Sequence, residues 1–213
     1  MTPAEMSRAA KEICALAPVV PVLVVDEVAH AAPLATALVK GGLPALEVTL
    51  RTPAALEVIR AMAEVEGGHV GAGTLLTPAD VKAAKAAGAT FGVSPGLTET
   101  VVKACQDEGL PLLPGCVTAS EVMRALEMGF TMLKFFPAET SGGAPAIKAI
   151  GAPIPQVTFC PTGGVSMKNV LDYLSLKNVL CCGGSWVAPK EAMVAGDWAK
   201  IEALAAEAAA LRA

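Results

Sequence analysis

One unit recurs along this chain: a helical stretch ends at a glycine, and two or so residues later a short apolar strand begins. Gly42, Gly88, Gly109 and Gly129 each occupy this position. Glycine directly after a helix adopts the left-handed backbone conformation that caps the helix, at little steric cost. The repeat therefore predicts helices and strands in strict alternation.

The apolar segments predict eight strands, at residues 19–25, 45–50, 69–73, 90–93, 112–115, 132–136, 157–160 and 179–182. Signals for a helix start follow several of them: Thr52-Pro53, Thr77-Pro78 with Asp80 at the capping-box offset, and Thr118 with Glu121. Strands alternating with helices at a spacing of roughly 20 to 25 residues predict an α/β fold of the (β/α)₈ TIM-barrel type. An open doubly wound sheet is the alternative.

Amphipathic helices are expected at both ends of the chain. Residues 3–16 carry apolar side chains near helical spacing, so residues 1–17 are expected to form an extra N-terminal helix that covers one end of the barrel. A last helix begins after a cap at Asp197 and packs on the outside. No linker interrupts the chain, which predicts a single TIM-barrel domain over residues 1–213. A content of 54% apolar and 17% charged residues suits a sheet covered on both faces.

Composition excludes several classes of protein. The longest apolar run, residues 14–25, is too short to span a membrane and contains Pro18 and Pro21. Charged residues near the N-terminus exclude a signal peptide, so a cytoplasmic protein is expected. A net charge of -4 gives no attraction to nucleic acid or to an anionic membrane. The six cysteines show neither a metal-ligand spacing nor a disulfide framework, which predicts no metal site.

A single lysine interrupts residues 132–139, which otherwise have the composition of a buried strand. Burying an unpartnered ammonium is costly, so Lys134 either pairs with an anion or loses its proton, and a neutral amine is a nucleophile. Pro137 cannot continue a central strand, which places Lys134 near the C-terminal end, where α/β barrels carry their chemistry. The alternative is a lysine on an edge strand with its head group in water.

Glu47, Thr49 and Arg51 alternate with apolar residues along the second strand. Side chains alternate across a strand, so these three share one face at successive spacings of about 7 Å. In a barrel covered by helices, that face is the interior and its upper rim. The alternative is a structural ion pair inside the barrel.

Turns rich in glycine end several other strands. The small residues of 70–73 leave room at the rim before the hydroxyl of Thr74, and 94–96 form a tight turn that walls a pocket. Glycine pairs follow the seventh and eighth strands at 163–164 and 183–184. Barrels of this type bind phosphate there, through backbone N–H groups and the N-terminus of a short following helix.

A lysine, a carboxylate and an arginine at the rim, together with a phosphate site, indicate covalent catalysis on a phosphorylated keto compound. A neutral Lys134 amine adds to a carbonyl and forms a Schiff base, which makes a neighbouring carbon–carbon bond labile. Burial and the positive charge of Arg51 are both expected to favour the neutral amine. Glu47 would carry the proton. No catalytic role is assigned to His30, His69, Trp186, Trp198 or Cys116, although Cys116 is placed at the pocket as an oxidisable thiol.

These motifs closely resemble the 2-keto-3-deoxy-6-phosphogluconate (KDPG) aldolase family. The resemblance runs in order over about residues 18–189 and rests on residues 46–52, 71–74, 94–98, 133–139, 161–164 and 183–186. It implies a class I Schiff-base aldolase, with no metal and no cofactor, that reversibly cleaves KDPG to pyruvate and D-glyceraldehyde 3-phosphate in the Entner–Doudoroff pathway. Side activity on 4-hydroxy-2-oxoglutarate (KHG) and a homotrimeric assembly are also implied by the resemblance.

The resemblance assigns a role to each matching residue. Lys134 would be the Schiff-base lysine and Glu47 the general acid and base. Arg51 and Thr74 would hold the pyruvate carboxylate, while Pro95 and Phe136 shape the pocket. The distal phosphate would be received by Thr162, Gly163, Gly164, Gly184 and Ser185.

Two other functions remain compatible with these residues. A phosphosugar isomerase or epimerase on the same barrel would use the phosphate turns and Glu47, and would keep Lys134 as an electrostatic contact only. A non-catalytic phospholigand-binding protein needs no base beside a nucleophile, so the pairing of Glu47 with Lys134 argues against it.

Overall fold

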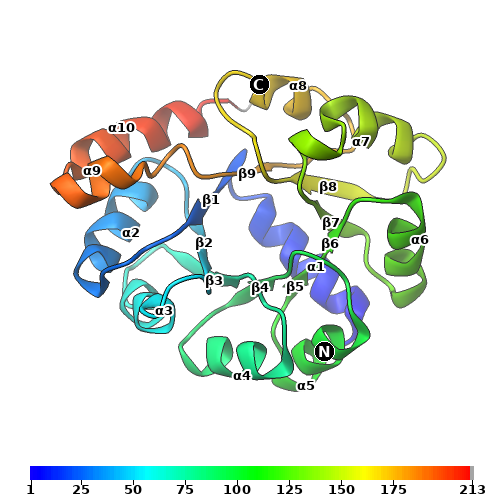
Figure 1. The fold of residues 1–213 in the computed structure, drawn as a ribbon, viewed down its shortest axis with the longest axis horizontal. Coiled ribbons are helices and arrows are strands. Elements are labelled where there is room, and N and C mark those ends of the chain that lie inside the picture. The colour runs from blue at the N-terminus through cyan, green and yellow to red at the C-terminus, as the bar shows by residue number, and fades with distance from the viewer. Residues whose placement is uncertain (212–213) are drawn as a thin grey trace.

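Parallel strands occupy the centre of the computed structural model, which describes residues 1–211, and helices lie around them (Figure 1). The strands are β1 (Val19–Leu23), β2 (Ala45–Thr49), β3 (His69–Gly73), β4 (Phe91–Val93), β5 (Leu112–Leu113), β6 (Gly115–Cys116), β7 (Met132–Phe135), β8 (Thr158–Pro161) and β9 (Cys182–Gly184). The α-helices are α1 (Pro3–Cys14), α2 (Ala31–Lys40), α3 (Ala55–Ala63), α4 (Pro78–Ala86), α5 (Glu99–Glu108), α6 (Ala119–Met128), α7 (Gly143–Gly151), α8 (Val170–Leu174), α9 (Lys190–Ala195) and α10 (Trp198–Ala209). Two 3₁₀ turns, η1 (Val28–His30) and η2 (Glu139–Ser141), complete the order.

The strands form a curled parallel sheet in two hydrogen-bonded parts. One part has the order β5-β4-β3-β2-β1-β9 and the other has the order β6-β7-β8. Pro114 alone separates β5 from β6, and isolated parallel bridges join Phe159 to Val179 and Thr162 to Gly183. Because the strands are parallel, their C-terminal ends lie at the same edge of the sheet. Helices separate successive strands everywhere except between β5 and β6, so the predicted alternation of strands with helices is confirmed.

Most predicted strands lie where the sequence places them, within one or two residues. The last is wrong by three residues, because β9 comprises Cys182–Gly184 and residue 179 forms only an isolated bridge. The glycines expected to form a turn instead continue the ladder, with Gly184 paired to Pro21 of β1. The segment 112–115 is divided at Pro114, which has no N–H to donate to a ladder.

The predicted helix caps are confirmed with one exception. Gly42, Gly88, Gly109 and Gly129 all have positive φ, at 89°, 98°, 62° and 102°. Capping boxes form at the starts of α4 and α6, as expected. Thr52 does not cap α3, which begins at Ala55; its hydroxyl donates instead to the carbonyl of Val25 at 2.8 Å.

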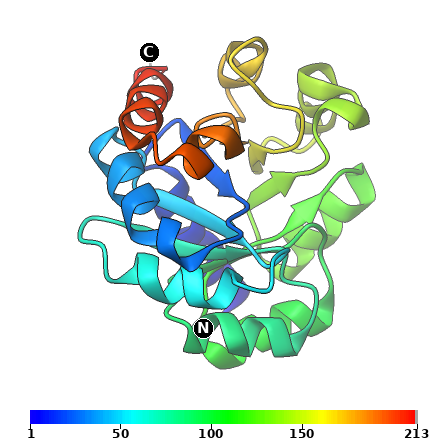
Figure 2. The ribbon, with the colours of Figure 1, turned by 60° about the vertical axis from the view of Figure 1, so that its left-hand side comes forward.

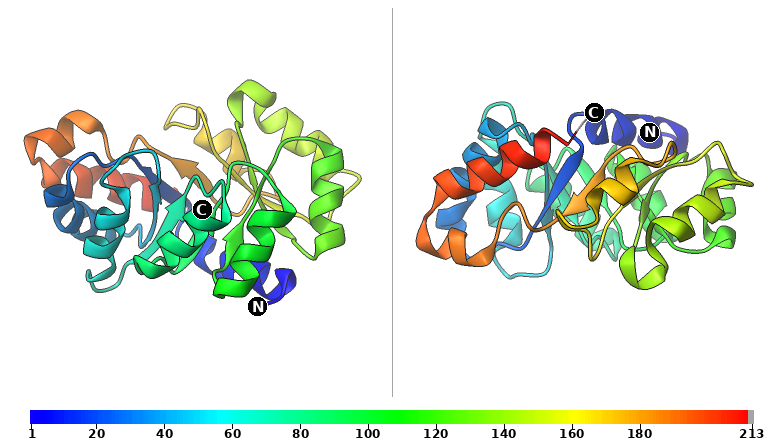
Figure 3. Two further views of the ribbon diagram at one scale, coloured as in Figure 1. Left: turned by 60° about the horizontal axis from the view of Figure 1, so that its bottom comes forward. Right: turned by 90° about the horizontal axis from the view of Figure 1, so that it is seen from above.

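The helices at the two chain ends pack differently. In α10 the buried residues Ile201, Ala205 and Ala208 recur at helical spacing, and the helix packs beside α2 (Figure 2). By contrast α1 contacts β5 and β7 and crosses the middle of Figure 1. Figure 3 shows α1 and the end of α10 on the same side of the strands. Pro18, which follows α1, and Leu211, which follows α10, line one hollow. None of the helices within residues 1–211 is both long and apolar enough to cross a bilayer.

One buried hydroxyl joins α1 to the strand that carries Lys134. Ser7 is 1% exposed, and its Oγ accepts hydrogen bonds from the backbone N–H groups of Thr131 at 2.9 Å and Met132 at 3.0 Å. Both donors stand at the beginning of β7. The Ser7 hydroxyl therefore gives these two N–H groups an acceptor at the point where the chain enters β7.

Ser7→Ala is expected to lower the free energy of unfolding by about 1 to 3 kcal/mol, because it leaves a buried N–H group without an acceptor. Urea denaturation measures this value. Thr36→Ala is the matched control, since the Thr36 hydroxyl only bonds the carbonyl of Ala32 on its own exposed helix turn. Equal effects of the two substitutions would contradict the assigned contact.

Candidate active site

Lys134, near the C-terminal end of β7, and Glu47, the middle residue of β2, form a buried ion pair. The Nζ of Lys134 lies 3.1 Å from Oε1 of Glu47, and the two residues are 6% and 2% exposed. The burial of Lys134 excludes the alternative of a lysine with its head group in water. Lys134 therefore has a carboxyl partner, which is one of the two ways in which the sequence allows its side chain to be buried.

Strand register and a glycine position this pair. Lys134 stands in register with Gly115 on one side and Cys160 on the other, so its backbone is held from both neighbouring strands. A Cβ placed on Gly73 would lie 2.3 Å from Oε1 of Glu47. The glycine of β3 therefore leaves the space that the carboxylate occupies.

Phe136 adds an aromatic wall to the site. Its ring centroid lies 5.3 Å from Nζ of Lys134, within the range of a cation–π contact. The peptide bond between Phe136 and Pro137 is cis, and β7 ends at Phe135. The expectation that Pro137 ends the strand is confirmed.

Arg51 lies in the turn two residues beyond the end of β2. Its Nε donates to Oγ1 of Thr49 at 3.2 Å, and the residue is exposed. Among residues 1–211 its guanidinium forms no salt bridge. The terminal nitrogens are therefore available to an anionic ligand.

Thr74 and Pro95 lie at the ends of the next two strands. Thr74 directly follows β3 and has φ of 65°, a left-handed conformation that is strained for a β-branched residue. Backbone strain of this kind concentrates at functional sites. Pro95 follows β4, and its carbonyl lies so close to Gly115 that a Cβ there would stand 2.1 Å away.

The glycine turn after β8 and the glycine pair that ends β9 lie beside one another at the same edge of the sheet. Thr162 bridges to Gly183, and the side chain of Thr162 fills the space next to that glycine. Gly163 and Gly164 both have positive φ, at 99° and 79°. Gly184 ends β9 and Ser185 follows it, exposed. The five residues predicted to receive a phosphate are therefore gathered at adjacent strand ends.

The expected helix N-termini do not take part in this arrangement. After Gly164 the next helix, α8, begins only at Val170, and after Ser185 the next helix, α9, begins at Lys190. Both helices are short. The Thr162 hydroxyl donates to the carbonyl of Cys160 at 3.5 Å, and the Thr162 N–H donates to the carbonyl of Phe135 at 2.9 Å. The donors left to a ligand here are the N–H groups of Gly163 and Gly164 and the hydroxyl of Ser185.

Several remaining sequence assignments can be placed. His69 begins β3 and is exposed, and the ring of His30 contacts Trp198 at a centroid distance of 5.8 Å. Cys116 is buried in β6, and burial raises the pKa of its thiol to about 12. The role of Cys116 as an oxidisable thiol at the pocket stays a prediction.

Sequence reasoning missed two contacts at this edge. Trp186 fills the space next to Gly184, where a Cβ would stand 1.8 Å from its ring, and the indole Nε1 has no hydrogen-bond partner among the described residues. The second missed contact is that of the Thr49 hydroxyl with Arg51, because the sequence pattern identifies Thr49 only as part of the polar face of the second strand. Both contacts depend on three-dimensional proximity, although the polar Thr49 between Glu47 and Arg51 was a visible signal.

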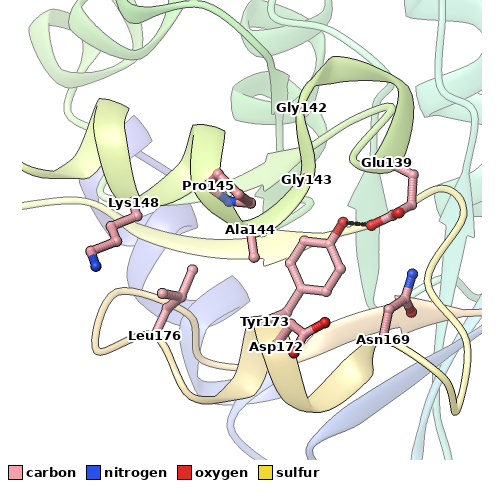
Figure 4. Close-up of a pocket in the computed structure, with 10 residues that line it drawn as sticks. All are labelled: Glu139, Gly142, Gly143, Ala144, Pro145, Lys148, Asn169, Asp172, Tyr173 and Leu176. Atoms are coloured by element: carbon pink, nitrogen blue, oxygen red, sulfur yellow. Dashed lines mark hydrogen bonds between the residues drawn. The ribbon is translucent and has the colours of Figure 1, made fainter.

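A pocket of about 700 Å³ lies between α7 and α8, outside the lysine site (Figure 4). Its lining residues come from the two helices and their approaches: Glu139, Gly142, Gly143, Ala144, Pro145, Lys148, Asn169, Asp172, Tyr173 and Leu176. The hydroxyl of Tyr173 donates to Glu139, and burial together with this carboxylate raises the pKa of Tyr173. The Lys134–Glu47 pair does not line this pocket.

The family model and the curated relative that match this chain both describe aldolases. Residues 10–204 match the family model described as KDPG and KHG aldolase. The 2-dehydro-3-deoxy-phosphogluconate aldolase of Pseudoalteromonas atlantica is 53% identical over 201 residues, which cover 94% of each chain.

Two solved structures are also similar over most of the chain. The KDPG aldolase of Zymomonas mobilis with 3-phosphoglycerate is 48% identical, with a TM-score of 0.91 and 97% of each chain covered. The KDPG aldolase of Legionella pneumophila, with pyruvate captured as a covalent carbinolamine intermediate, is 44% identical. Its TM-score is 0.90, and the match covers 93% of this chain and 97% of that one.

Gly184→Ala is expected to weaken binding of inorganic phosphate and to lower stability by about 1 to 3 kcal/mol, because the new methyl group overlaps the Trp186 ring and must displace the turn. Isothermal titration and urea denaturation measure the two effects. Gly96→Ala is the matched control, since a Cβ at Gly96 meets nothing within 4 Å. Unchanged phosphate binding in the Gly184 variant would exclude this turn as a phosphate site.

Proposed function

The chain belongs to the KDPG and KHG aldolase family, and from this premise we propose that it reversibly cleaves KDPG to pyruvate and D-glyceraldehyde 3-phosphate as a class I aldolase. The observation that carries the chemistry is the buried pair of Lys134 and Glu47, 3.1 Å apart. An amine and a carboxylate in contact supply both a nucleophile and a proton carrier. Side activity on KHG is part of the proposal.

Proton transfer within the pair generates the nucleophile. Moving one proton from Lys134 to Glu47 gives a neutral amine beside a neutral acid, without changing the net charge of the buried site. The amine nitrogen attacks the C2 keto carbon, and the acid protonates the oxyanion to give a carbinolamine. Glu47 then takes the excess proton from nitrogen and returns it to the departing hydroxyl, so that water leaves and a protonated Schiff base remains.

The same carboxylate serves the bond-breaking step. Glu47 accepts the proton of the C4 hydroxyl, the C3–C4 bond breaks, and its electron pair moves toward the protonated Schiff base. Glyceraldehyde 3-phosphate leaves and an enamine remains on Lys134. Protonation of C3 and addition of water release pyruvate and restore the amine.

The other candidate residues bind the two ends of the substrate. Arg51 and Thr74 hold the carboxylate, supported by the unpaired guanidinium and by the hydroxyl that follows β3. Phe136 and Pro95 shape the walls between them, supported by the 5.3 Å contact of Phe136 with Lys134.

The phosphate of the substrate is assigned to the paired turns. Thr162, Gly163 and Gly164 after β8, with Gly184 and Ser185 at the end of β9, line adjacent strand ends. Gly163 and Gly164 offer backbone N–H groups there, and Ser185 offers a hydroxyl. Support comes from the bridge between Thr162 and Gly183, which keeps the two turns together.

We extend the proposal to architecture and assembly. The described residues 1–211 form one domain, the curled sheet closes as a (β/α)₈ barrel, and α1 covers one end; residues 212 and 213 of the predicted domain lie outside the described residues. Closure of the barrel is supported by the bridges of Phe159 to Val179 and of Thr162 to Gly183, and by the single residue between β5 and β6. The assembly is a homotrimer, as the family resemblance implies. The cytoplasm is the assigned compartment, since all six cysteines are free and buried.

The two competing functions are not favoured. The relatives named above are aldolases, and the structure of the Legionella relative holds pyruvate as a covalent carbinolamine. An isomerase, an epimerase or a phospholigand-binding protein would not require a nucleophilic amine at Lys134.

Treatment with borohydride in the presence of pyruvate is expected to inactivate the enzyme and to leave a pyruvyl adduct on Lys134, because the reductant traps a Schiff base. Peptide mass spectrometry locates the adduct. Lys134→Ala should form no adduct and have no turnover, with its circular dichroism spectrum unchanged. Lys148→Ala, which removes an exposed lysine from α7, should react like the parent. An adduct on any other lysine would contradict the assignment of Lys134 as the Schiff-base residue.

Glu47→Gln is expected to reduce kcat about 10²- to 10⁴-fold, the usual contribution of general acid–base catalysis. Its amide keeps the size of the side chain but cannot carry the proton. Steady-state kinetics of KDPG cleavage measure kcat, and titration with pyruvate measures binding. A variant that loses pyruvate affinity but keeps its rate would remove Glu47 from the proton-transfer role.

A further inference from the structure

Thr49 is a buried polar residue between two proposed site residues. It ends β2, is 3% exposed, and shares a strand face with Glu47 two residues before it, whereas Arg51 lies two residues after it, beyond the strand. A buried hydroxyl is costly unless both its donor and its acceptor capacities are used well. Its partners therefore indicate what it does.

The hydrogen bonds of this hydroxyl run in one direction. A threonine hydroxyl has a single proton, and Thr49 donates it to the carbonyl oxygen of Leu23 at 2.9 Å. Towards Arg51 the same oxygen can then only accept, and it receives the Nε–H at 3.2 Å. The carbonyl at the end of β1 thus fixes the orientation of the hydroxyl, and the hydroxyl fixes the Nε of the arginine.

This arrangement leaves the outer edge of the guanidinium free. With Nε bonded to Thr49, the two terminal nitrogens of Arg51 remain, and these nitrogens can grip a carboxylate with two parallel hydrogen bonds. Arg51 is exposed and has no acidic partner within residues 1–211, so without Thr49 its long side chain would sample many rotamers. Holding it in place before binding lowers the entropic cost of binding.

We infer that Thr49 is a positioning residue that orients Arg51 for the substrate carboxylate. The inference rests on the proposed function, in which Arg51 binds that carboxylate. Thr49 itself does not contact the reacting atoms in this assignment. A purely structural role, as a tie between β1 and β2, is the competing explanation.

The chain contains a matched control for that competing role. Thr52 donates its hydroxyl to the carbonyl of Val25 at 2.8 Å, a second bond between the ends of the same two chain segments. No hydrogen bond joins Thr52 to Arg51 among the described residues. Thr52→Val therefore removes a comparable tie and leaves the Arg51 Nε contact in place.

The experiment compares Thr49→Val, Thr49→Ser and Thr52→Val in the full-length protein. The pyruvate concentration that half-saturates borohydride trapping, and the KM and kcat of aldol condensation, are measured for each. Thr49→Val is expected to raise the pyruvate KM and the half-saturating concentration about three- to tenfold, the effect of one hydrogen bond, with kcat little changed. Thr49→Ser should restore the parent values, and Thr52→Val should keep them.

A double-substitution cycle identifies the route of the effect. In an Arg51→Ala background, Thr49→Val is expected to have no further effect on pyruvate half-saturation, because Thr49 acts through the guanidinium. Equal pyruvate values for Thr49→Val and the parent, equal losses in Thr49→Val and Thr52→Val, or a full effect in the Arg51→Ala background would each overturn the inference. Failure of the parent protein itself to form an adduct would instead overturn the proposed function, so the two failures are distinguishable.

Discussion

The buried contact between Lys134 and Glu47 is the interaction on which the rest of the site depends. Either charge alone would be costly at this depth, and the pair is tolerated because each group compensates the other. The same compensation allows one proton to move between them without creating a net charge. The proposed nucleophile and proton carrier are thus in contact inside the protein, and the strands that carry them hold them 3.1 Å apart.

Missing side chains shape the rim around this pair as much as the side chains that are present. At Gly73, Gly183 and Gly184, the space of an absent Cβ is filled by Glu47, Thr162 and Trp186, respectively. Each glycine therefore admits a side chain from a neighbouring segment to close range. Functional groups can approach the strand ends without widening the sheet, which keeps the pair and the proposed phosphate turns within one small region.

The hydrogen bonds at the end of β2 show how a rigid element can support an exposed arginine that is proposed to bind the substrate carboxylate. Glu47 and Thr49 are held by the strand, whereas Arg51 lies beyond it and is exposed. The short chain of bonds from the Leu23 carbonyl through Thr49 carries the rigidity of the sheet out to the guanidinium. Preorganisation of this kind favours binding without adding a contact to the ligand.

The sequence by itself determined the alternation of strands and helices, the glycine caps and the candidate residues, because these depend on local conformation and on period-two patterning. Gly88 and Gly109 needed only local backbone sterics to be placed correctly. The tertiary structure decided the shift of the last strand to Cys182–Gly184, the separation of α8 from the glycine turn after β8, and the pairing of Lys134 with Glu47. Each of these depends on what lies opposite in space: a strand follows its hydrogen-bonding partner, and a buried charge follows its nearest counter-charge.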